Sequence, residues 1–278
     1  MEVIILPKIS ILMLSWNTSF HTIECLKSLQ KQSFKNFEVI VVDNGSTLED
    51  YKKLENGIKN LKIKIILKRL EKNSGITGGM NFAYRFANSE YIVFMNNDMI
   101  TTKNFLSELL SPFYRYENVG AAVPMIKTWK DGPTNEIQLS GGKLTFYGTL
   151  INKELEKYGS KIYNKETELD CVTAGCLLVK RKILEKLGEV FPPFYSVYFE
   201  DIDLSWRIKN AGLKIIYAPK SVVYHKGSMS INLNEMPGSR QKFVVRNKYL
   251  TFWRNLPVYD FVIIFPFLLV FDLLRALK

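Results

Sequence analysis

Two acidic clusters hold the side chains best suited to chemistry. Asn96-Asn97-Asp98 follows five apolar residues, and Glu200-Asp201-Ile202-Asp203 places three carboxylates within four positions. Mg²⁺ or Mn²⁺ takes oxygen ligands, often one or two carboxylates together with phosphate oxygens, and a carboxylate is a typical general base toward a hydroxyl group. Each cluster also has a structural alternative. Asp98 or Thr101 could cap a helix that starts near Lys103, and acids in a first helical turn complement the helix dipole.

Three further motifs carry polar groups that could bind a ligand. In Asp43-Asn44-Gly45-Ser46 the carboxylate could accept hydrogen bonds from a nucleobase or ribose, although Asn-Gly is also a turn signal. Residues 73–81, NSGITGGMN, open a predicted helix with glycines, which would leave backbone N–H groups facing a phosphate. They match neither a P-loop nor GxGxxG. His225 follows a short apolar run; a lone histidine is more often structural, but here it could complete a metal site.

The first half of the chain alternates between predicted strands and predicted helices. The strands are residues 9–14, 37–42, 63–67 and 91–95, and the helices are 18–30, 48–58 and 76–87. This rhythm predicts βαβ units and a parallel sheet, with right-handed crossovers that bring the carboxyl ends of the strands to one side. Ligands of open α/β sheets bind at that side, so we expect the polar segments after these strands, beginning with Ser15-Trp16-Asn17, to meet in one crevice.

The second half of the chain is less regular and ends in a basic and apolar segment. Strands are predicted at 120–125, 171–180, 215–217 and 222–224, a hairpin or loop at 138–150 and a helix at 200–212. Residues 239–254 interleave five basic residues with aromatic and aliphatic ones, which is typical either of an interfacial amphipathic helix or of an ordinary helix with a solvated basic face. The uncharged run 261–271 is shorter than the roughly 20 residues that a spanning helix needs.

Composition narrows the classes of protein. The 278 residues are 47% hydrophobic, which is enough for one large α/β domain with an appendage and excludes wholesale disorder. The net charge of +11 suits a polyanionic partner, but no nucleic-acid recognition module is present, so we expect no nucleic-acid partner. Three cysteines without a CxxC pair suggest neither disulfides nor a zinc site and fit a cytoplasmic setting. The first residues lack the basic flank and cleavage site of a signal peptide.

Taken together and in order, these motifs resemble the inverting family 2 glycosyltransferases of the GT-A fold, in particular their rhamnosyltransferase-like branch. No single motif is decisive, but the ordered set covers roughly residues 9–230. The matching motifs are Ser15-Trp16-Asn17, Val41-Val42-Asp43-Asn44-Gly45-Ser46, Asn73-Ser74-Gly75 with Gly78-Gly79 and Asn81, Met95-Asn96-Asn97-Asp98, Thr173-Ala174-Gly175, Phe199-Glu200-Asp201-x-Asp203-Leu204 with Arg207, and His225 with Gly227-Ser228.

The resemblance implies a fold and a set of residue roles. The fold is α/β: a Rossmann-like GT-A domain over residues 1–238, with a mostly parallel sheet and helices on both faces, followed by a membrane-associated helical segment over 239–278. Asp201 would be the catalytic base, with Glu200 beside it, and Asp98 with His225 would hold Mg²⁺ or Mn²⁺ on the donor diphosphate. The implied donor-binding residues are Ser15, Asn17, Asp43 (at the nucleobase), Asn73, Gly75, Gly79, Asn97 and Asp98, and the implied acceptor-side residues are Ala174, Gly175 and Asp203.

The implied function is sugar transfer from a dTDP-, UDP- or GDP-linked donor to a hydroxyl of a glycan or polyprenyl-linked acceptor. The product would serve cell-surface polysaccharide or glycoconjugate synthesis, with the chain peripheral on the anionic cytoplasmic face of the membrane. One departure concerns the metal: the family's acidic DxD-type motif reads Asn96-Asn97-Asp98 here, so fewer carboxylates hold the ion. The alternative is a non-catalytic nucleotide-sugar-binding module, against which the presence of Asp98, Asp201 and Asp203 argues.

Overall fold

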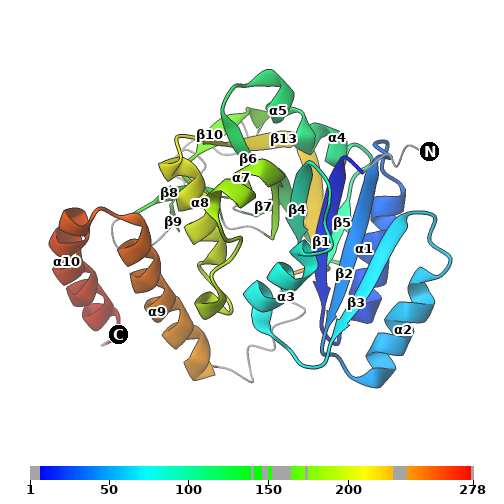
Figure 1. Ribbon diagram of the computed structural model, residues 1–278, viewed down its shortest axis with the longest axis horizontal. Coiled ribbons are helices and arrows are strands. Elements are labelled where there is room, and N and C mark those ends of the chain that lie inside the picture. The colour runs from blue at the N-terminus through cyan, green and yellow to red at the C-terminus, as the bar shows by residue number, and fades with distance from the viewer. Residues whose placement is uncertain are drawn as a thin grey trace.

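The computed structural model describes residues 7–138, 141–145, 150–151, 164–172, 175–227 and 237–276. Within these residues one large sheet has the strand order β10-β13-β6-β12-β4-β1-β2-β3, while β5 pairs with β13 and β7 pairs with β6 (Figure 1). Its strands are β1 (Ile9–Ser15), β2 (Phe37–Asn44), β3 (Lys64–Leu70), β4 (Tyr91–Met95), β5 (Met99–Thr101), β6 (Val119–Trp129), β7 (Pro133–Gln138), β10 (Thr167–Leu169), β12 (Cys176–Lys180) and β13 (Lys214–His225). A small sheet contains β8 (Gly141–Leu144), β9 (Leu150–Ile151) and β11 (Cys171–Val172).

Helices cover both faces of the large sheet, as the sequence predicted. Their bounds are α1 (Ser19–Gln30), α2 (Leu48–Ile58), α3 (Gly75–Tyr84), α4 (Phe105–Leu110), α5 (Pro112–Arg115), α7 (Arg181–Leu187), α8 (Glu200–Asn210), α9 (Pro237–Asn255) and α10 (Val258–Ala276), with a 3₁₀ turn at Pro193–Tyr195. Alternate residues of each central strand enter different cores. In β1, Ile11 and Met13 pack in a core shared with α1, α2 and α4, whereas Leu12 packs in a core shared with α3, α7 and α8. Central strands buried on both faces explain the continuous apolar runs in the sequence.

The expectation of a mostly parallel sheet is correct only for the first half of the chain. Strands β4, β1, β2 and β3 are parallel to one another, but β12 lies antiparallel between β4 and β6. Strand β13 is parallel to β6 and antiparallel to β10 and β5. The sheet is therefore mixed. Parallel neighbours need a long crossover, usually helical, whereas the chain between β6 and β12 carries short strands that return as hairpins.

Three details of the predicted strands need correction. The single strand predicted at 171–180 is two strands in different sheets, β11 and β12, and the two strands predicted at 215–217 and 222–224 are one strand, β13, with a register shift after Ala218. Strand β5 was not predicted, because three residues carry no periodic signal. Of the two alternatives for residues 138–150, a hairpin or a loop, the antiparallel pair β8 and β9 supports the hairpin.

Helices α9 and α10 lie together at the end of the molecule opposite α2 (Figure 1). Helix α9 confirms the helix predicted at 239–254, and it packs against α8. Helix α10 contains the apolar run 261–271, including Pro266. Among the described residues, no helix has both the length and the apolar character needed to cross a bilayer.

Candidate active site

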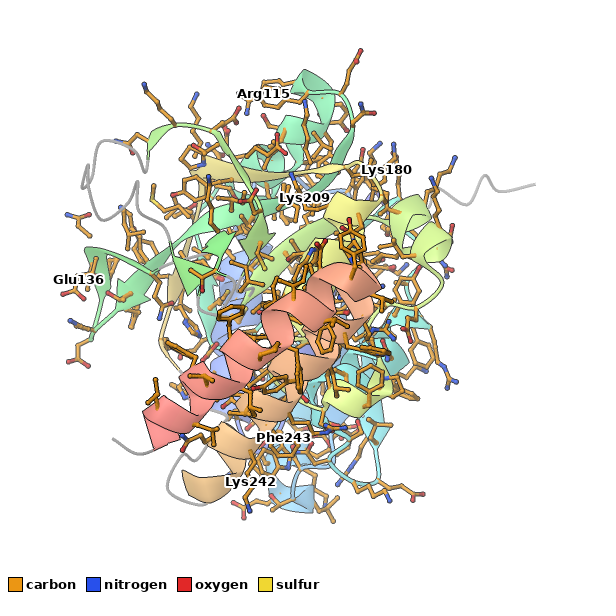
Figure 2. All side chains as sticks on the ribbon, turned by 90° about the vertical axis from the view of Figure 1, so that its left-hand side faces the viewer. Arg115, Glu136, Lys180, Lys209, Lys242 and Phe243 are labelled. Atoms are coloured by element: carbon orange, nitrogen blue, oxygen red, sulfur yellow. The ribbon has the colours of Figure 1, made fainter. Side chains whose placement is uncertain are left out.

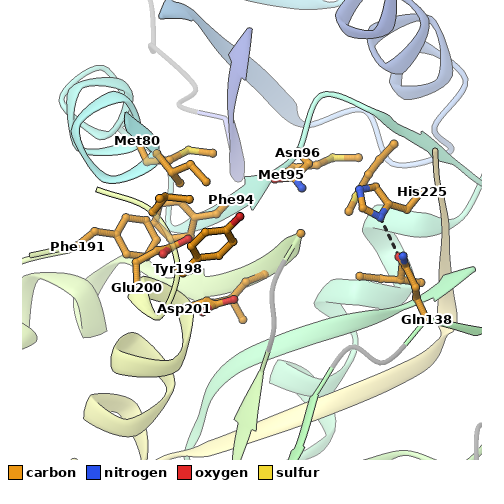
Figure 3. A pocket seen from close by; sticks show the side chains of 16 residues that line it. Met80, Phe94, Met95, Asn96, Gln138, Phe191, Tyr198, Glu200, Asp201 and His225 are labelled. Carbon is orange, nitrogen blue, oxygen red and sulfur yellow. Dashed lines mark hydrogen bonds between the residues drawn. The ribbon is translucent and has the colours of Figure 1, made fainter. Parts of the chain in front are cut away.

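One cavity, about 450 Å³ in volume, lies between the carboxyl end of β4 and the beginning of α8. It brings together four of the predicted site residues: Gly175, Glu200, Asp201 and His225. In Figure 3, Glu200 and Asp201 lie on one side of the cavity, and His225 lies on the other. The remaining lining residues are largely apolar: Ile76, Met80, Phe94, Met95, Asn96, Met99, Ile126, Gln138, Leu177, Phe191, Val197 and Tyr198.

The sheet topology places Asp98 beside His225. Strand β5 pairs with β13, and the register puts His225 opposite Met99, the residue that follows Asp98. Nε2 of His225 lies 3.2 Å from Oδ1 of Asp98, and both side chains are largely buried. The helix-capping alternative for Asp98 and Thr101 is wrong, because α4 begins at Phe105 with Asn104 as its N-cap residue.

Gln138 orients the imidazole of His225. Its side-chain oxygen lies 2.8 Å from Nδ1 of His225 (Figure 3). An amide oxygen only accepts hydrogen bonds, so Nδ1 carries the proton, and in the neutral ring Nε2 presents its lone pair toward Asp98. Metal-binding histidines are held in this way by a hydrogen bond to the second ring nitrogen. Gln138 could not be predicted as a site residue, because no motif in the sequence distinguishes it.

The residues around Asp98 fit a divalent ion that arrives with its own oxygen ligands. In the part of the chain that the structure describes, no group of three or more histidine, cysteine, aspartate or glutamate side chains could hold a metal. Asp98 and His225 supply two ligand atoms of suitable type, one carboxylate oxygen and one imidazole nitrogen. Mg²⁺ and related ions are often bound by one or two carboxylates plus substrate phosphates. The pair is therefore sufficient only if a diphosphate completes the coordination.

Helix α8 brings the other two acids to the cavity. Its N-cap residue Phe199 has a left-handed φ of 72°, and Glu200 and Asp201 occupy the first turn. Burial, followed by the neighbouring charge of Asp201, raises the pKa of Glu200 to about 8. Near neutral pH, Glu200 is therefore mostly protonated, which limits the negative charge that the two neighbouring acids bring to the cavity.

The raised pKa of Glu200 predicts a pH-dependent effect of Glu200→Gln on stability. The native state keeps this proton up to about pH 8, whereas the unfolded chain releases it near the usual 4.5, so the carboxyl group lowers stability progressively as pH rises between those values. Glu200→Gln removes that loss. We expect the substitution to raise the free energy of unfolding at pH 8 and to change it little at pH 4.5, measured by urea denaturation. An equal gain in the free energy of unfolding at both pH values would contradict the raised pKa of Glu200. The same gain from Glu55→Gln, at an exposed glutamate, would contradict it too.

Two of the predicted donor-binding residues lie beneath the site. The amide nitrogen of Asn97 donates to the hydroxyl oxygens of Thr18 and Thr22, at 2.7 and 2.8 Å. The Thr22 hydroxyl in turn donates to Oγ of Ser15, at 2.9 Å. Ser15 is fully buried and Asn97 nearly so. These contacts tie the loop after β4 to α1 and give Ser15 and Asn97 a supporting role.

Asn17 and Asp43 lie where the loops after β1 and β2 meet. The side-chain oxygen of Asn17 accepts from Thr47 N, and Asn17 N donates to Oγ of Ser46, both at 2.9 Å. Asp43 is buried, and its Oδ2 lies 3.3 Å from Nε of Arg69, its register partner on β3. Burial raises the pKa of Asp43, while hydrogen bonds from Ser46 and the charge of Arg69 oppose the rise. The negative charge of this buried carboxylate is thus only partly balanced. Asp43 can therefore accept a hydrogen bond from a further N–H or O–H group.

The expectation that the glycine-rich helix start leaves free N–H groups for phosphate is wrong. Ile76 N and Thr77 N both donate to Ser196 O, and Gly75 N donates to the side chain of Asn73. Gly75 has φ +73°, and a Cβ there would lie 2.8 Å from Ser196 O. A Cβ on Gly79 would likewise lie 2.8 Å from the Leu14 side chain. These glycines allow α3 to pack closely on β1 and on the turn that precedes α8.

The predicted acceptor-side position of Asp203 is also wrong, and Ala174 lies outside the described residues. Asp203 is fully buried and accepts from Arg207 Nε at 2.8 Å and from Asn255 Nδ2 at 2.9 Å. Arg254 forms a second ion pair with it at 3.4 Å. Asp203 therefore joins α8 to α9 by a buried polar network. The i,i+4 spacing to Arg207 was the only signal of this in the sequence.

Asp203→Asn is expected to destabilise the protein by about 3 kcal/mol, because two arginines lose the buried charge that compensates them. Urea denaturation at neutral pH measures this loss. The matched control is Glu49→Gln, which breaks the exposed ion pair with Lys53 and should change the stability little. Equal losses from the two substitutions would contradict a structural role for Asp203.

Comparison with known proteins places this chain in a family. Residues 10–188, more than half of the chain, match the model of Glycosyl transferase family 2. The O-antigen biosynthesis protein RfbC of Myxococcus xanthus is 27% identical over 215 residues, which cover 75% of this chain and 16% of RfbC. The O-antigen chain rhamnosyltransferase WbaN of Salmonella anatum is 28% identical over 212 residues, which cover 76% of this chain and 61% of WbaN.

Solved structures support the fold. GalNAc-T7 with UDP, GalNAc and Mn²⁺ superposes with a TM-score of 0.69 at 17% identity, covering 90% of this chain and 48% of that one. At that identity the likeness concerns the fold alone. The chain spans less than two-thirds of the length of each of these three proteins. The fold is of the GT-A type, and the chain belongs to glycosyltransferase family 2.

Proposed function

We propose that this glycosyltransferase moves a sugar from a nucleotide-diphosphate donor to a hydroxyl of a glycan or lipid-linked acceptor, with inversion of the anomeric centre. One observation carries the proposal: a single cavity is lined by His225, which lies 3.2 Å from the buried Asp98, on one side and by Glu200 and Asp201 on the other. The O-antigen relatives support a role in cell-surface polysaccharide synthesis.

The two sides of the cavity suit different parts of the reaction. Asp98 and His225 would hold a Mg²⁺ or Mn²⁺ ion, which neutralises the charge of the departing diphosphate. Asp201 takes the proton from the acceptor hydroxyl, and the oxygen attacks the anomeric carbon from the face opposite the diphosphate. Because Glu200 is protonated near neutral pH, it places no second negative charge beside Asp201.

A thermal-shift panel tests donor binding and identifies the nucleotide. The panel contains dTDP-, UDP- and GDP-sugars, each with and without Mg²⁺ or Mn²⁺. A ligand at 100 times its dissociation constant stabilises the native state by about 2.7 kcal/mol, which such a panel detects. The proposal requires stabilisation by at least one donor, larger with the ion present, and release of nucleoside diphosphate during turnover. Binding without turnover would favour the alternative of a non-catalytic module.

Helices α9 and α10 form the surface that we propose for membrane attachment, on the anionic cytoplasmic leaflet. Val262, Ile263 and Phe267 of α10 are each 62% exposed, although such side chains are usually covered. Figure 2 shows α10 lying outside α9, with Lys242 near one end of α9. Lys242 and Arg246 are exposed. Basic side chains near an anionic leaflet contribute about 1 kcal/mol each, and exposed apolar side chains add to that.

The double substitution Ile263→Glu with Phe267→Glu is expected to weaken binding to phosphatidylglycerol vesicles at least about tenfold. Burying a large apolar side chain contributes about 1.5–3 kcal/mol, and both side chains are exposed, so the fold loses little. Vesicle co-sedimentation measures the change. The control is Leu48→Glu with Tyr114→Glu, the same charge change at exposed apolar residues of α2 and α5. Equal loss from both pairs would assign the effect to charge alone and would contradict the proposed surface.

A further inference from the structure

The segment that leads into the catalytic acids has an unusual backbone. Ser196, Tyr198 and Phe199 have φ values of 57°, 66° and 72°. Three non-glycine residues in the left-handed region within four positions are uncommon, and such residues persist only where surrounding contacts hold them. Glu200 and Asp201 follow directly, so the direction in which these side chains leave the backbone depends on this turn.

Asn247 of α9 holds the turn from behind. Its side chain is fully buried, and Nδ2 lies 3.0, 2.8 and 2.9 Å from the carbonyl oxygens of Tyr195, Val197 and Tyr198. Its neighbour Arg246 donates from Nη1 to Phe194 O at 2.8 Å. The carbonyl groups of this turn thus accept hydrogen bonds from the side chains of Arg246 and Asn247 on α9.

The turn is held by helix α3 as well. Ile76 N, at the start of α3, donates to Ser196 O at 2.8 Å, and Thr77 N donates to the same oxygen at 3.3 Å. The carbonyl of Ser196 therefore points to α3, while those of Tyr195, Val197 and Tyr198 point to α9. Contacts from two sides fix the turn, and Tyr198 lines the cavity beside the acids (Figure 3).

We propose that Asn247 is a positioning residue, which holds the turn at residues 195–199 so that Asp201 faces the acceptor hydroxyl. The inference rests on the proposed function for the role of Asp201. Helix α9 lies outside residues 10–188, the part of the chain that matches the family model. Helix α9 thus supports the catalytic acids in addition to any role at a membrane surface.

Two substitutions in the full chain test the proposal. Asn247→Leu removes the donor at nearly constant volume, and Asn247→Asp replaces it with a carboxylate that faces three carbonyl oxygens. The control is Lys248→Gln on the same helix, which breaks an ion pair to Asp272 of α10 and leaves the turn contacts in place. The measurements are hydrogen exchange of peptides covering residues 193–200, and kcat and KM for hydrolysis of the best nucleotide sugar from the thermal-shift panel.

The proposal predicts faster exchange in residues 193–200 for both Asn247 variants but not for Lys248→Gln. It also predicts a fall in kcat of about 100-fold with the donor KM within threefold of wild type, because a misplacement near 1 Å costs about that much. Unchanged exchange in residues 193–200, a rise in KM with unchanged kcat, or failure of both Asn247 variants to fold while Lys248→Gln folds would overturn it. Absence of turnover by the wild type, with the exchange difference present, would count against the proposed function alone.

Discussion

Asp201→Asn is expected to lower the transfer rate by about 10²- to 10⁴-fold while donor binding stays near the wild-type value. An amide cannot accept the proton of the acceptor hydroxyl, and a positioned general base contributes about that factor. Donor binding should persist because His225, which with Asp98 forms the proposed ion site, lies across the cavity from Asp201. Rates of transfer and of donor hydrolysis give the first quantity, and calorimetric titration with the nucleotide sugar gives the second.

The control for this experiment is Asp131→Asn, the same change at an exposed aspartate in the turn between β6 and β7. Asparagine tolerates the left-handed φ of 53° at Asp131, so the turn should keep its conformation. The control should retain wild-type rates. If Asp201→Asn also retains them, Asp201 is not the base, and the neighbouring acid Glu200 becomes the candidate.

A graded loss of metal affinity is expected across Asp98, His225 and Gln138. Asp98→Asn removes the carboxylate and His225→Leu removes the imidazole, and each should weaken Mn²⁺ binding more than about 100-fold in the presence of nucleoside diphosphate. Gln138→Leu leaves both ligands but frees the imidazole to rotate, and loss of such a partner typically costs about 10- to 100-fold. Mn²⁺ titrations with and without nucleoside diphosphate measure all three variants.

The comparison with and without nucleoside diphosphate is the decisive part of that experiment. Because Asp98 and His225 supply only two ligands, Mn²⁺ should bind the wild type weakly until the diphosphate is present. Equal Mn²⁺ affinity in Asp98→Asn and the wild type would remove Asp98 from the ion site. Tight Mn²⁺ binding without nucleotide would contradict the requirement for a diphosphate.

The fold of the first half could be predicted from local patterns in the sequence. Helix α2 and strand β4 have the predicted bounds, because apolar periodicity and flanking polar residues mark both ends. The antiparallel insertion of β12 and the pairing of β5 with β13 could not be predicted in this way. They depend on contacts between distant segments, and such contacts leave no periodic signal in either segment.

The residues of the candidate site also divide into those that local sequence patterns predict and those that they do not. Asp98, Glu200, Asp201 and His225 belong to motifs with a recognisable residue type and order, and the structure brings them to one region. Asp203 was misplaced, because a carboxylate in a first helical turn looks the same in sequence whether it faces a cavity or a buried arginine. Gln138 acts through one hydrogen bond and Asn247 through three, in each case to residues far away in the sequence.

The anomeric configuration of the sugar released from the donor tests the central claim most directly. Proton NMR follows hydrolysis of the nucleotide sugar by the full chain, with water in place of the acceptor hydroxyl. The account predicts that the sugar first appears with the configuration opposite to that of the donor, in step with nucleoside diphosphate, and that Asp201→Asn suppresses both. Release with the donor's own configuration, or release at an unchanged rate in Asp201→Asn, would contradict direct displacement assisted by Asp201.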